Sequence, residues 1–479
     1  MNKASLPLLL VLVLFGNGLR SVVTSTVFVS EGAFASFLRI SVTQTSAVVE
    51  LLLGAVLVAL LIAPQLIARF QPRQLAGVMC LVAGMASLGL ALVFWLSPPL
   101  TMREASVFVL FPLLGFSLAT LAPVAQLMTG WGSEKHTKLL TGAWAVAMPL
   151  AFLVTPQLIH AIAPHYGLEV FFTGFAAVVF LLIAGLLLVK APVASLEDAG
   201  NQQQRVAAGG SLLPVLAALV SFEVATTLVT LTGITSLYTL VAAAVFVLAL
   251  GYFLVTMRRQ KSVTAGSREV PDLEVLGIFA FMFLVNVATN GFYDTAYLFE
   301  HLKADTLITD RATLSALTQV AAAMGTTAIL ARYDLQRPLM LIGAIITAIG
   351  LGSFLLYQPF PSAEVFIGSK MLSSFGAGIL ITAAIFACSN SASGSGALAF
   401  FIAFVIVIGT EVGLEGFEIM TSIMRLIGVP SGQIYSTIFL LQCLLVLVAM
   451  PLIFMRSAAR QQPSMKQESV AWKSCAPMG

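Results

Sequence analysis

The sequence predicts an all-α, polytopic membrane protein with fourteen transmembrane helices, arranged as two pseudo-symmetric six-helix bundles and two inserted helices. Three observations lead to this fold class: the composition, the length of the apolar runs, and a turn that occurs twice at half-chain distance. Hydrophobic residues make up 59% of the chain and charged residues only 9%, whereas a soluble globular domain carries about 25% charged residues. We therefore expect the chain to lie in a lipid bilayer. The net charge of +3 is small and spread over turns, which argues against a nucleic-acid partner.

The apolar runs are long enough to cross a membrane as helices. A helix needs roughly 20 residues to span about 30 Å of hydrocarbon. Transmembrane β-strands are short and alternate in polarity, whereas runs such as 179–189 are continuously apolar. The predicted spans lie at 5–29, 44–68, 74–96, 105–128, 139–162, 168–190, 211–232, 235–257, 273–298, 309–331, 338–358, 364–388, 396–419 and 433–455.

A basic turn between two apolar runs occurs once in each half of the chain. The first turn, IARFQPR at 67–73, contains Arg69 and Arg73, and the second, LARYDLQR at 330–337, contains Arg332 and Arg337. Shorter matches between the two halves, such as Asn-Gly at 17–18 and again at 290–291, occur in the same order along each half. Repeated halves are typical of transporters whose two parts move about a central site. We expect the four arginines to belong to loops that take part in this motion.

The lysines and arginines predict the orientation of the chain. If the N-terminus is cytoplasmic, most of them fall on the inner side, and only Arg39, Arg103, Lys303, Arg311 and Arg425 fall outside. This asymmetry predicts that both termini are cytoplasmic. The two longest polar loops bracket the seventh and eighth spans. We therefore predict an N-terminal bundle at 1–190, a linker with two inserted helices at 191–272, a C-terminal bundle at 273–456, and a cytoplasmic tail at 457–479.

In this arrangement the chain resembles the major facilitator superfamily, specifically its fourteen-helix branch, typified by drug:proton antiporters. Members of this family carry G-x-x-x-D-R-x-G-R-R between helices 2 and 3, and this chain keeps the two arginines but has Ala68 in place of the acid. Glycines and prolines that are typical of helices 4 and 5 of the family are also present, at Gly115, Pro123, Gly142, Pro149 and Pro156. Two positions depart from the family: Phe111 replaces the arginine of helix 4, and Arg20 aligns with an acidic residue of helix 1. The resemblance implies a secondary transporter that works by alternating access.

Charged residues inside the spans are the strongest candidates for a functional site, because an ionised side chain at mid-helix costs about 2.5–3.5 kcal/mol on insertion scales. In the superfamily arrangement five of them lie on helices that face the central cavity, and these five lie in its outer half. They are Arg20, Glu50, Asp294, Lys370 and Glu411.

The thirteenth predicted span carries a stripe of acids. Glu411, Glu415 and Glu418 follow an i, i+4, i+7 spacing and share one helix face. Either they form a stripe that exchanges protons or attracts cations, or the outer two are solvated at the membrane interface. Glu223 stands alone in the middle of the seventh span; because that helix is expected at the periphery, a structural partner or a protonated state is the favoured interpretation.

The remaining candidates each have two interpretations. Arg20 either binds a carboxylate or phosphate of the substrate or pairs with Glu50 or Asp294. Lys370 falls close to the position that corresponds to Phe111 of the first half, so it is either a functional cation or a structural one. Four uncharged residues either contact cargo or connect and pack helices, which is the commoner use. They are Asn17, Asn290, Trp144 and Tyr293.

No H-E-x-x-H, G-x-x-x-x-G-K-[ST] or G-x-S-x-G motif occurs in the sequence, so we predict no enzyme activity, no catalytic residues, no metal site and no cofactor. From the resemblance we expect a monomer in a bacterial inner membrane that exports small organic or drug-like molecules in exchange for protons. Glu411 and Glu50 would exchange the protons. The alternatives are uptake or exchange of an organic anion, such as a carboxylate metabolite or siderophore, bound by Arg20 and Lys370, and a membrane sensor that does not transport.

Overall fold

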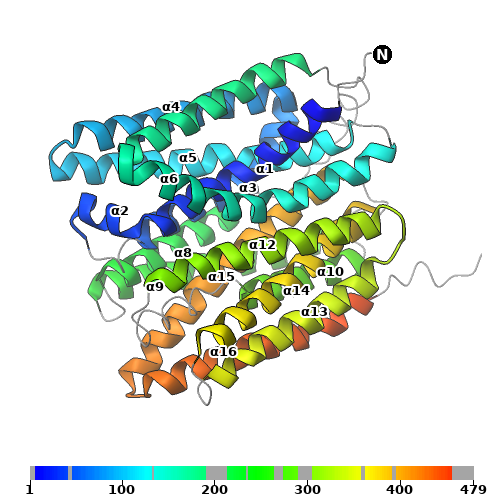
Figure 1. Ribbon diagram of the computed structural model, residues 1–479. Helices are drawn as coiled ribbons and strands as arrows, with labels where there is room; N and C mark the ends of the chain where they lie inside the picture. Colours follow the sequence, from blue (N-terminus) through cyan, green and yellow to red (C-terminus); the bar gives the residue numbers. More distant parts are fainter. Residues whose placement is uncertain are drawn as a thin grey trace, which may run out of the picture.

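The computed structural model describes residues 6–40, 46–131, 134–189, 213–232, 236–263, 273–289, 305–357, 362–390 and 395–455. This part of the chain is helical and contains no strand, as the continuous apolar runs predict. Figure 1 shows long helices packed side by side with their axes roughly aligned. Their bounds are α1 Leu6–Val29, α2 Glu31–Leu38, α3 Ser46–Arg69, α4 Pro72–Leu96, α5 Leu100–Thr129, α6 Glu134–Leu188, α8 Leu213–Thr232, α9 Leu237–Val263, α10 Leu273–Thr289, α12 Asp305–Leu330, α13 Gln336–Ser353, α14 Ala363–Asn390, α15 Ser395–Leu426 and α16 Ser431–Ala449, with short 3-10 helices at Phe354–Tyr357 and Met450–Phe454.

The chain is a multi-pass membrane protein. Among the described residues, 8 helices are long and apolar enough to cross a membrane. Shorter apolar helices at Val48–Ala63, Leu216–Leu228, Leu237–Ala249 and Glu274–Thr289 coincide with other predicted spans. Large apolar side chains cover the outside of the helices; Trp95 is 70% and Leu248 is 73% exposed. Such a surface is stable only against an apolar solvent. The total of fourteen spans stays a prediction.

Helix α6 contains two of the predicted spans, 139–162 and 168–190. It runs for 55 residues and is divided by Gly167, whose φ of 77° and ψ of 169° are not helical. A residue with a Cβ rarely adopts this conformation, so glycine is required where the two segments join. The helix is therefore two segments with a kink between them.

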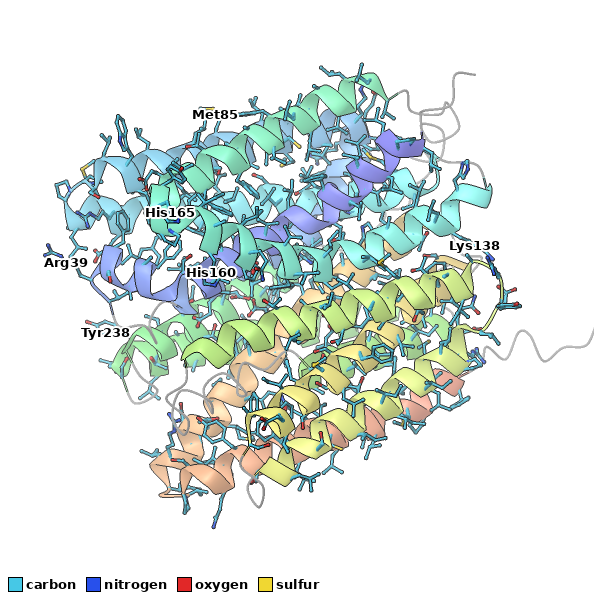
Figure 2. The ribbon with its side chains drawn as sticks, viewed as in Figure 1. Arg39, Met85, Lys138, His160, His165 and Tyr238 are labelled. Carbon is cyan, nitrogen blue, oxygen red and sulfur yellow. The ribbon has the colours of Figure 1, made fainter. Side chains whose placement is uncertain are left out.

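Polar residues near the ends of the helices lie at the two opposite ends of the bundle. In Figure 2, Lys138 lies at one end of the bundle, and Arg39 and Tyr238 lie at the other. Arg39 follows α2, a short helix that the sequence pattern did not predict, and it ends this helix in the left-handed conformation with φ 56°. Lys138 and Arg39, which are predicted on opposite sides of the membrane, therefore lie at opposite ends of the bundle, and which end is cytoplasmic stays a prediction.

Helix contacts recur between the first and second parts of the chain. In the first part, α5 packs against α1, α3 and α4, and α6 packs against α1 and α4. In the second part, α14 packs against α10, α12 and α13, while α10 packs against α15 and α13 packs against α16. The first set occupies one side of the molecule and the second set the other (Figure 1). Contacts between the sets join α3 to α15 and α6 to α12, and α8 packs against α9 and α3.

Candidate functional site

Most of the candidate residues lie in the described part of the chain, on helices at or near the contact between the two sets. Asn17 and Arg20 lie on α1, Glu50 on α3, Trp144 on α6, Lys370 on α14, and Glu411 and Glu415 on α15. Asn290, Tyr293 and Asp294 lie outside the described residues.

Three predicted acids are buried on α3 and α15, two helices that pack together. Glu50, Glu411 and Glu415 are 5%, 0% and 3% exposed. Both carboxylate oxygens of Glu411 are buried and have no hydrogen-bond partner in the described part of the chain. The burial of Glu415 argues against the interpretation that it is solvated. The side chain of Glu418 lies outside the described residues.

A fourth acid, Glu223 on α8, joins this group. It is 8% exposed, and its carboxyl group lies directly over Gly54 of α3, where a methyl group would be 2.8 Å from both Cδ and Oε2. Glu50 is one helical turn before Gly54 on α3. Glu411 and Glu415 lie on α15, which packs against α3. We name Glu50, Glu223, Glu411 and Glu415 the acidic group.

Sequence reasoning missed this grouping because it placed the seventh span at the periphery. The only indication in the sequence was the energetic cost of placing a single acid in the middle of a membrane span. In the structure, α8 packs against α3 as well as against α9, so Glu223 points into the protein. The acid that looked isolated in the sequence lies against α3, the helix that carries Glu50.

Arg20 carries a buried positive charge, and few nearby polar groups stabilise it. It is 6% exposed; Nη2 lies 4.0 Å from Sδ of Met148, and Nη1 is buried without a hydrogen-bond partner among the described residues. Among the described residues Arg20 forms no ion pair, with Glu50 or any other acid. A thioether is a weak acceptor, so this contact stabilises the guanidinium little. Lys370, on α14, is half-buried.

Asn17 and Trp144 connect three helices. Nδ2 of Asn17 donates to the carbonyl oxygen of Trp144 at 2.8 Å, and Nε1 of Trp144 donates to the carbonyl oxygen of Ala122 at 3.0 Å. Both side chains are buried, at 4% and 2% exposed. Gly18 lets α1 approach α6 closely, since a methyl group there would lie 3.2 Å from the carbonyl oxygen of Ala147. These contacts favour the helix-connecting interpretation for both residues.

The two basic turns use their arginines differently. Nη2 of Arg73 donates to the carbonyl oxygen of Leu187 at 2.7 Å, at the end of α6, where a cation is favourable. Nη2 of Arg337 lies 2.7 Å from Oε1 of Glu274 at the start of α10. The chain has alanine where the family's turn has an acid, and both contacts instead reach another helix. Arg69 and Arg332 are exposed. A role of these loops in conformational change stays a prediction.

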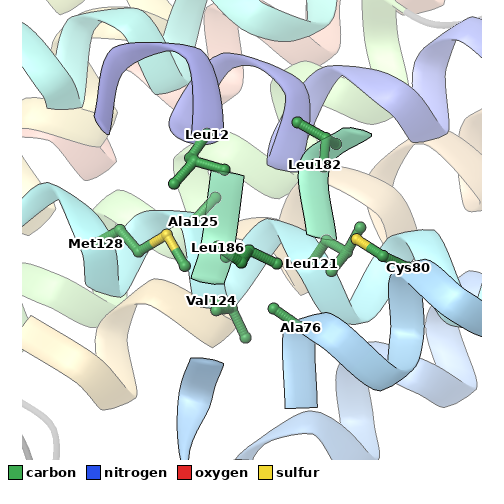
Figure 3. A pocket seen from close by; sticks show the side chains of 9 residues that line it. All are labelled: Leu12, Ala76, Cys80, Leu121, Val124, Ala125, Met128, Leu182 and Leu186. Atoms are coloured by element: carbon green, nitrogen blue, oxygen red, sulfur yellow. The ribbon is translucent and has the colours of Figure 1, made fainter. Parts of the chain in front are cut away.

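A small cavity lies among α1, α4, α5 and α6 (Figure 3). Its volume is about 20 Å³, and its lining is apolar apart from the thiol of Cys80. Pockets for small organic ligands measure about 300–1,000 Å³, so this cavity is a packing defect. The lining residues are Leu12, Ala76, Cys80, Leu121, Val124, Ala125, Met128, Leu182 and Leu186. Within the described ranges, no group of three or more His, Cys, Asp or Glu side chains is arranged to hold a metal ion.

Neither a known family's sequence pattern nor a curated protein sequence matches the chain. Solved structures do match its fold. The proton:xylose symporter XylE, a major facilitator superfamily protein bound to 6-bromo-6-deoxy-D-glucose, superposes with a TM-score of 0.62 at 13% identity, over 95% of this chain and 97% of that one. The human organic anion transporter MFSD10 (TETRAN) superposes with a TM-score of 0.57 at 14% identity, over 94% of this chain and 99% of that one. The chain therefore has the fold of the major facilitator superfamily.

Proposed function

We propose that this protein is a secondary active transporter whose two six-helix bundles, 1–190 and 273–456, rock about a central site. The recurrence of helix contacts between the two parts of the chain supports this layout. Helices α8 and α9 lie in the linker between the bundles, at 191–272. The predominance of lysine and arginine on one side supports cytoplasmic termini, and the resemblance of the sequence supports a bacterial inner membrane.

We further propose that transport is coupled to protons and exports small organic molecules. The observation that carries the coupling is the state of Glu411, which is fully buried with both carboxylate oxygens lacking hydrogen-bond partners in the described part of the chain. An ionised carboxylate in such a place is costly. Glu411 therefore binds a proton while it is enclosed and releases it when the rocking motion opens the site to water. Glu50, on the neighbouring helix α3, also binds and releases protons during transport.

The test is flux into proteoliposomes driven by an imposed pH gradient, with a panel of cationic dyes and organic anions as solutes. Wild-type protein should accumulate at least one of them, and Glu411→Gln and Glu50→Gln should reduce gradient-driven flux at least tenfold while binding persists. Unchanged gradient-driven flux in both variants would show that the proton role is wrong. Binding of a solute without flux under any gradient would instead support a sensor.

A second candidate, uptake or exchange of an organic anion, is favoured by Arg20. Its buried Nη1 has no hydrogen-bond partner in the part of the chain that the structure describes, and a guanidinium binds carboxylates and phosphates through paired donors. One structure with this fold is described as an organic anion transporter. In this proposal Lys370 assists Arg20. Arg20→Gln and Lys370→Gln should then abolish binding of anionic solutes and spare cationic ones. Equal loss of both kinds of solute would contradict it.

A further inference from the structure

The side chain of Arg20 faces the interior of the protein and has an unused donor. The exposed apolar residues of α1, Val11 at 41% and Phe15 at 39%, lie on the opposite side of the helix from Arg20, which is itself 6% exposed. Nη1 of Arg20 is buried and has no hydrogen-bond partner among the described residues. Because a guanidinium stays protonated in proteins, a full positive charge with an unsatisfied donor lies inside the protein.

Consecutive contacts between α1 and α6 fix the level of this guanidinium. Nδ2 of Asn17 donates to a backbone carbonyl oxygen of α6 at 2.8 Å, and Gly18 packs against the carbonyl oxygen of Ala147. One turn further along both helices, Nη2 of Arg20 donates towards Sδ of Met148 at 4.0 Å. The backbone contacts therefore hold the guanidinium of Arg20 beside the thioether of Met148.

Met148 is a poor partner for a buried cation and is able to move. A charge-assisted N–H···O bond is about 2.7–2.9 Å long, whereas the sulfur lies at 4.0 Å, and a thioether is a weak acceptor. Met148 is half-buried, and its side chain is unbranched and flexible. Val146 and Leu150, two positions away on either side, pack in a cluster with α12 on the other face of α6. The thioether can therefore move without disturbing the contact between the two sets of helices.

A single carboxylate group matches the donors of this guanidinium. Its two oxygens lie in one plane and accept two parallel N–H bonds from an arginine. Such a ligand would use both Nη1 of Arg20, which has no partner in the described ranges, and Nη2, which points at the sulfur. It also brings the buried charge to zero, whereas a phosphate dianion leaves an excess negative charge in a place where charge is costly.

We propose that Met148 occupies the position of the ligand's carboxylate at Arg20 and moves away when an organic carboxylate binds there. Met148 covers the guanidinium in the ligand-free protein, and a ligand binds by replacing a weak contact with a strong one. Met148 is therefore a specificity-determining residue. The inference rests on the anion function proposed for Arg20, and it adds the residue that controls access to that site and the chemical group that displaces it.

The direct test follows the methyl group of Met148 by NMR. Full-length protein with isotope-labelled methionine methyl groups is placed in lipid nanodiscs and titrated with benzoate, and Met148→Leu assigns the signal by removing it. Benzoate should shift the Met148 signal in a saturable way and leave the signal of Met85, which is 59% exposed on α4, in place. Arg20→Met should abolish the shift. Absence of benzoate binding, or binding that leaves the Met148 signal in place, would overturn the proposal.

Substitutions at position 148 change the competitor and keep the cation. Met148→Ala removes the group that has to be displaced, so the dissociation constant of benzoate should fall at least about threefold. Met148→Leu keeps a side chain of similar volume and should not bind benzoate more tightly than wild type. Met85→Ala supplies the control on α4 and should leave the affinity unchanged. Equal affinities in Met148→Ala and wild type would overturn the proposal.

A ligand-free experiment tests whether position 148 faces the donors of Arg20. Met148→Glu places a carboxylate where the thioether lies. Thermal unfolding should show that this substitution lowers the unfolding temperature less in the wild-type background than in Arg20→Met, because the buried carboxylate has no cation in the second case. Equal effects in the two backgrounds would overturn the proposal.

The flux assay separates this proposal from anion transport. If benzoate displaces Met148 but no organic anion crosses the proteoliposome membrane, the displacement stands and anion transport is refuted. If anion flux is lost in Arg20→Gln while the transported anion leaves the Met148 signal of the wild-type protein in place, the displacement is refuted and anion transport stands.

Discussion

Replacing Arg20 by methionine should make the ligand-free protein more stable. Arg20 is 6% exposed, and its one polar contact within the described residues is 4.0 Å to the sulfur of Met148. Methionine has a similar length and helix propensity, and it is apolar. Arg20→Met therefore removes a buried charge and keeps most of the packing.

The expected gain in stability follows from the lack of strong polar partners for the guanidinium group of Arg20. Replacing a buried ion pair by apolar side chains of similar volume is often neutral or stabilises a protein by about 1–4 kcal/mol, and a buried charge without a paired acid lacks even the attraction that offsets its desolvation. The contact that is lost contributes little, because a thioether is a weak acceptor. We expect a gain of about 1–4 kcal/mol in the free energy of unfolding, together with loss of anion binding. Thermal unfolding in detergent, followed by tryptophan fluorescence, measures the gain.

Arg103 provides the control because its guanidinium group, unlike that of Arg20, has several polar partners. Its guanidinium donates to the carbonyl oxygens of Pro98, Phe37 and Ser97 at 2.6, 3.2 and 3.0 Å, and its Cζ lies 4.9 Å from the ring centroid of Phe37. Arg103→Met should therefore lower the stability by at least about 1.5 kcal/mol. If Arg20→Met lowers the unfolding temperature as Arg103→Met does, Arg20 has a structural partner and the reasoning is refuted.

Two further substitutions test contacts between helices by the same thermal unfolding. Asn17→Ala removes the 2.8 Å bond to the carbonyl oxygen of Trp144 and should cost about 0.6–1.7 kcal/mol, with substrate binding retained; loss of binding at unchanged stability would indicate cargo contact instead. Arg337→Gln breaks the pair with Glu274, whose side chains are 27% and 19% exposed, so it should cost at most about 1 kcal/mol and less at high salt; a larger, salt-independent loss would contradict this.

The sequence predicts the fold well because membrane spans are a local property. Hydrophobic length alone places the apolar helices, since every backbone group in a membrane must be satisfied within its own helix. Helix α2 was missed because eight residues are too few for a hydropathy signal. The joint at Gly167 was predicted only as a boundary, because a single glycine does not reveal that the two segments follow without a loop.

The candidate site is less predictable because it depends on tertiary contacts. The positions of Arg20 and Glu411 within apolar runs show that an ionised side chain is costly there, and both side chains are buried in the structure. The partner of Asn17 is a backbone carbonyl 127 residues away, which no side-chain pattern reveals. Glu223 was undervalued because its surroundings depend on which helix packs against the face of α8 that carries it, and that contact with α3 is a tertiary one that the sequence of α8 does not reveal.

The central claim, that solute movement is coupled to protons at Glu411, is tested most directly by the reverse of the flux assay. Proteoliposomes with an entrapped pH-sensitive dye and no initial pH gradient are given a solute gradient, and the internal pH is recorded. The account predicts that a transported solute changes the internal pH in wild-type vesicles and that Glu411→Gln abolishes this change. A solute that crosses the membrane through wild-type protein without any change of internal pH would contradict the account.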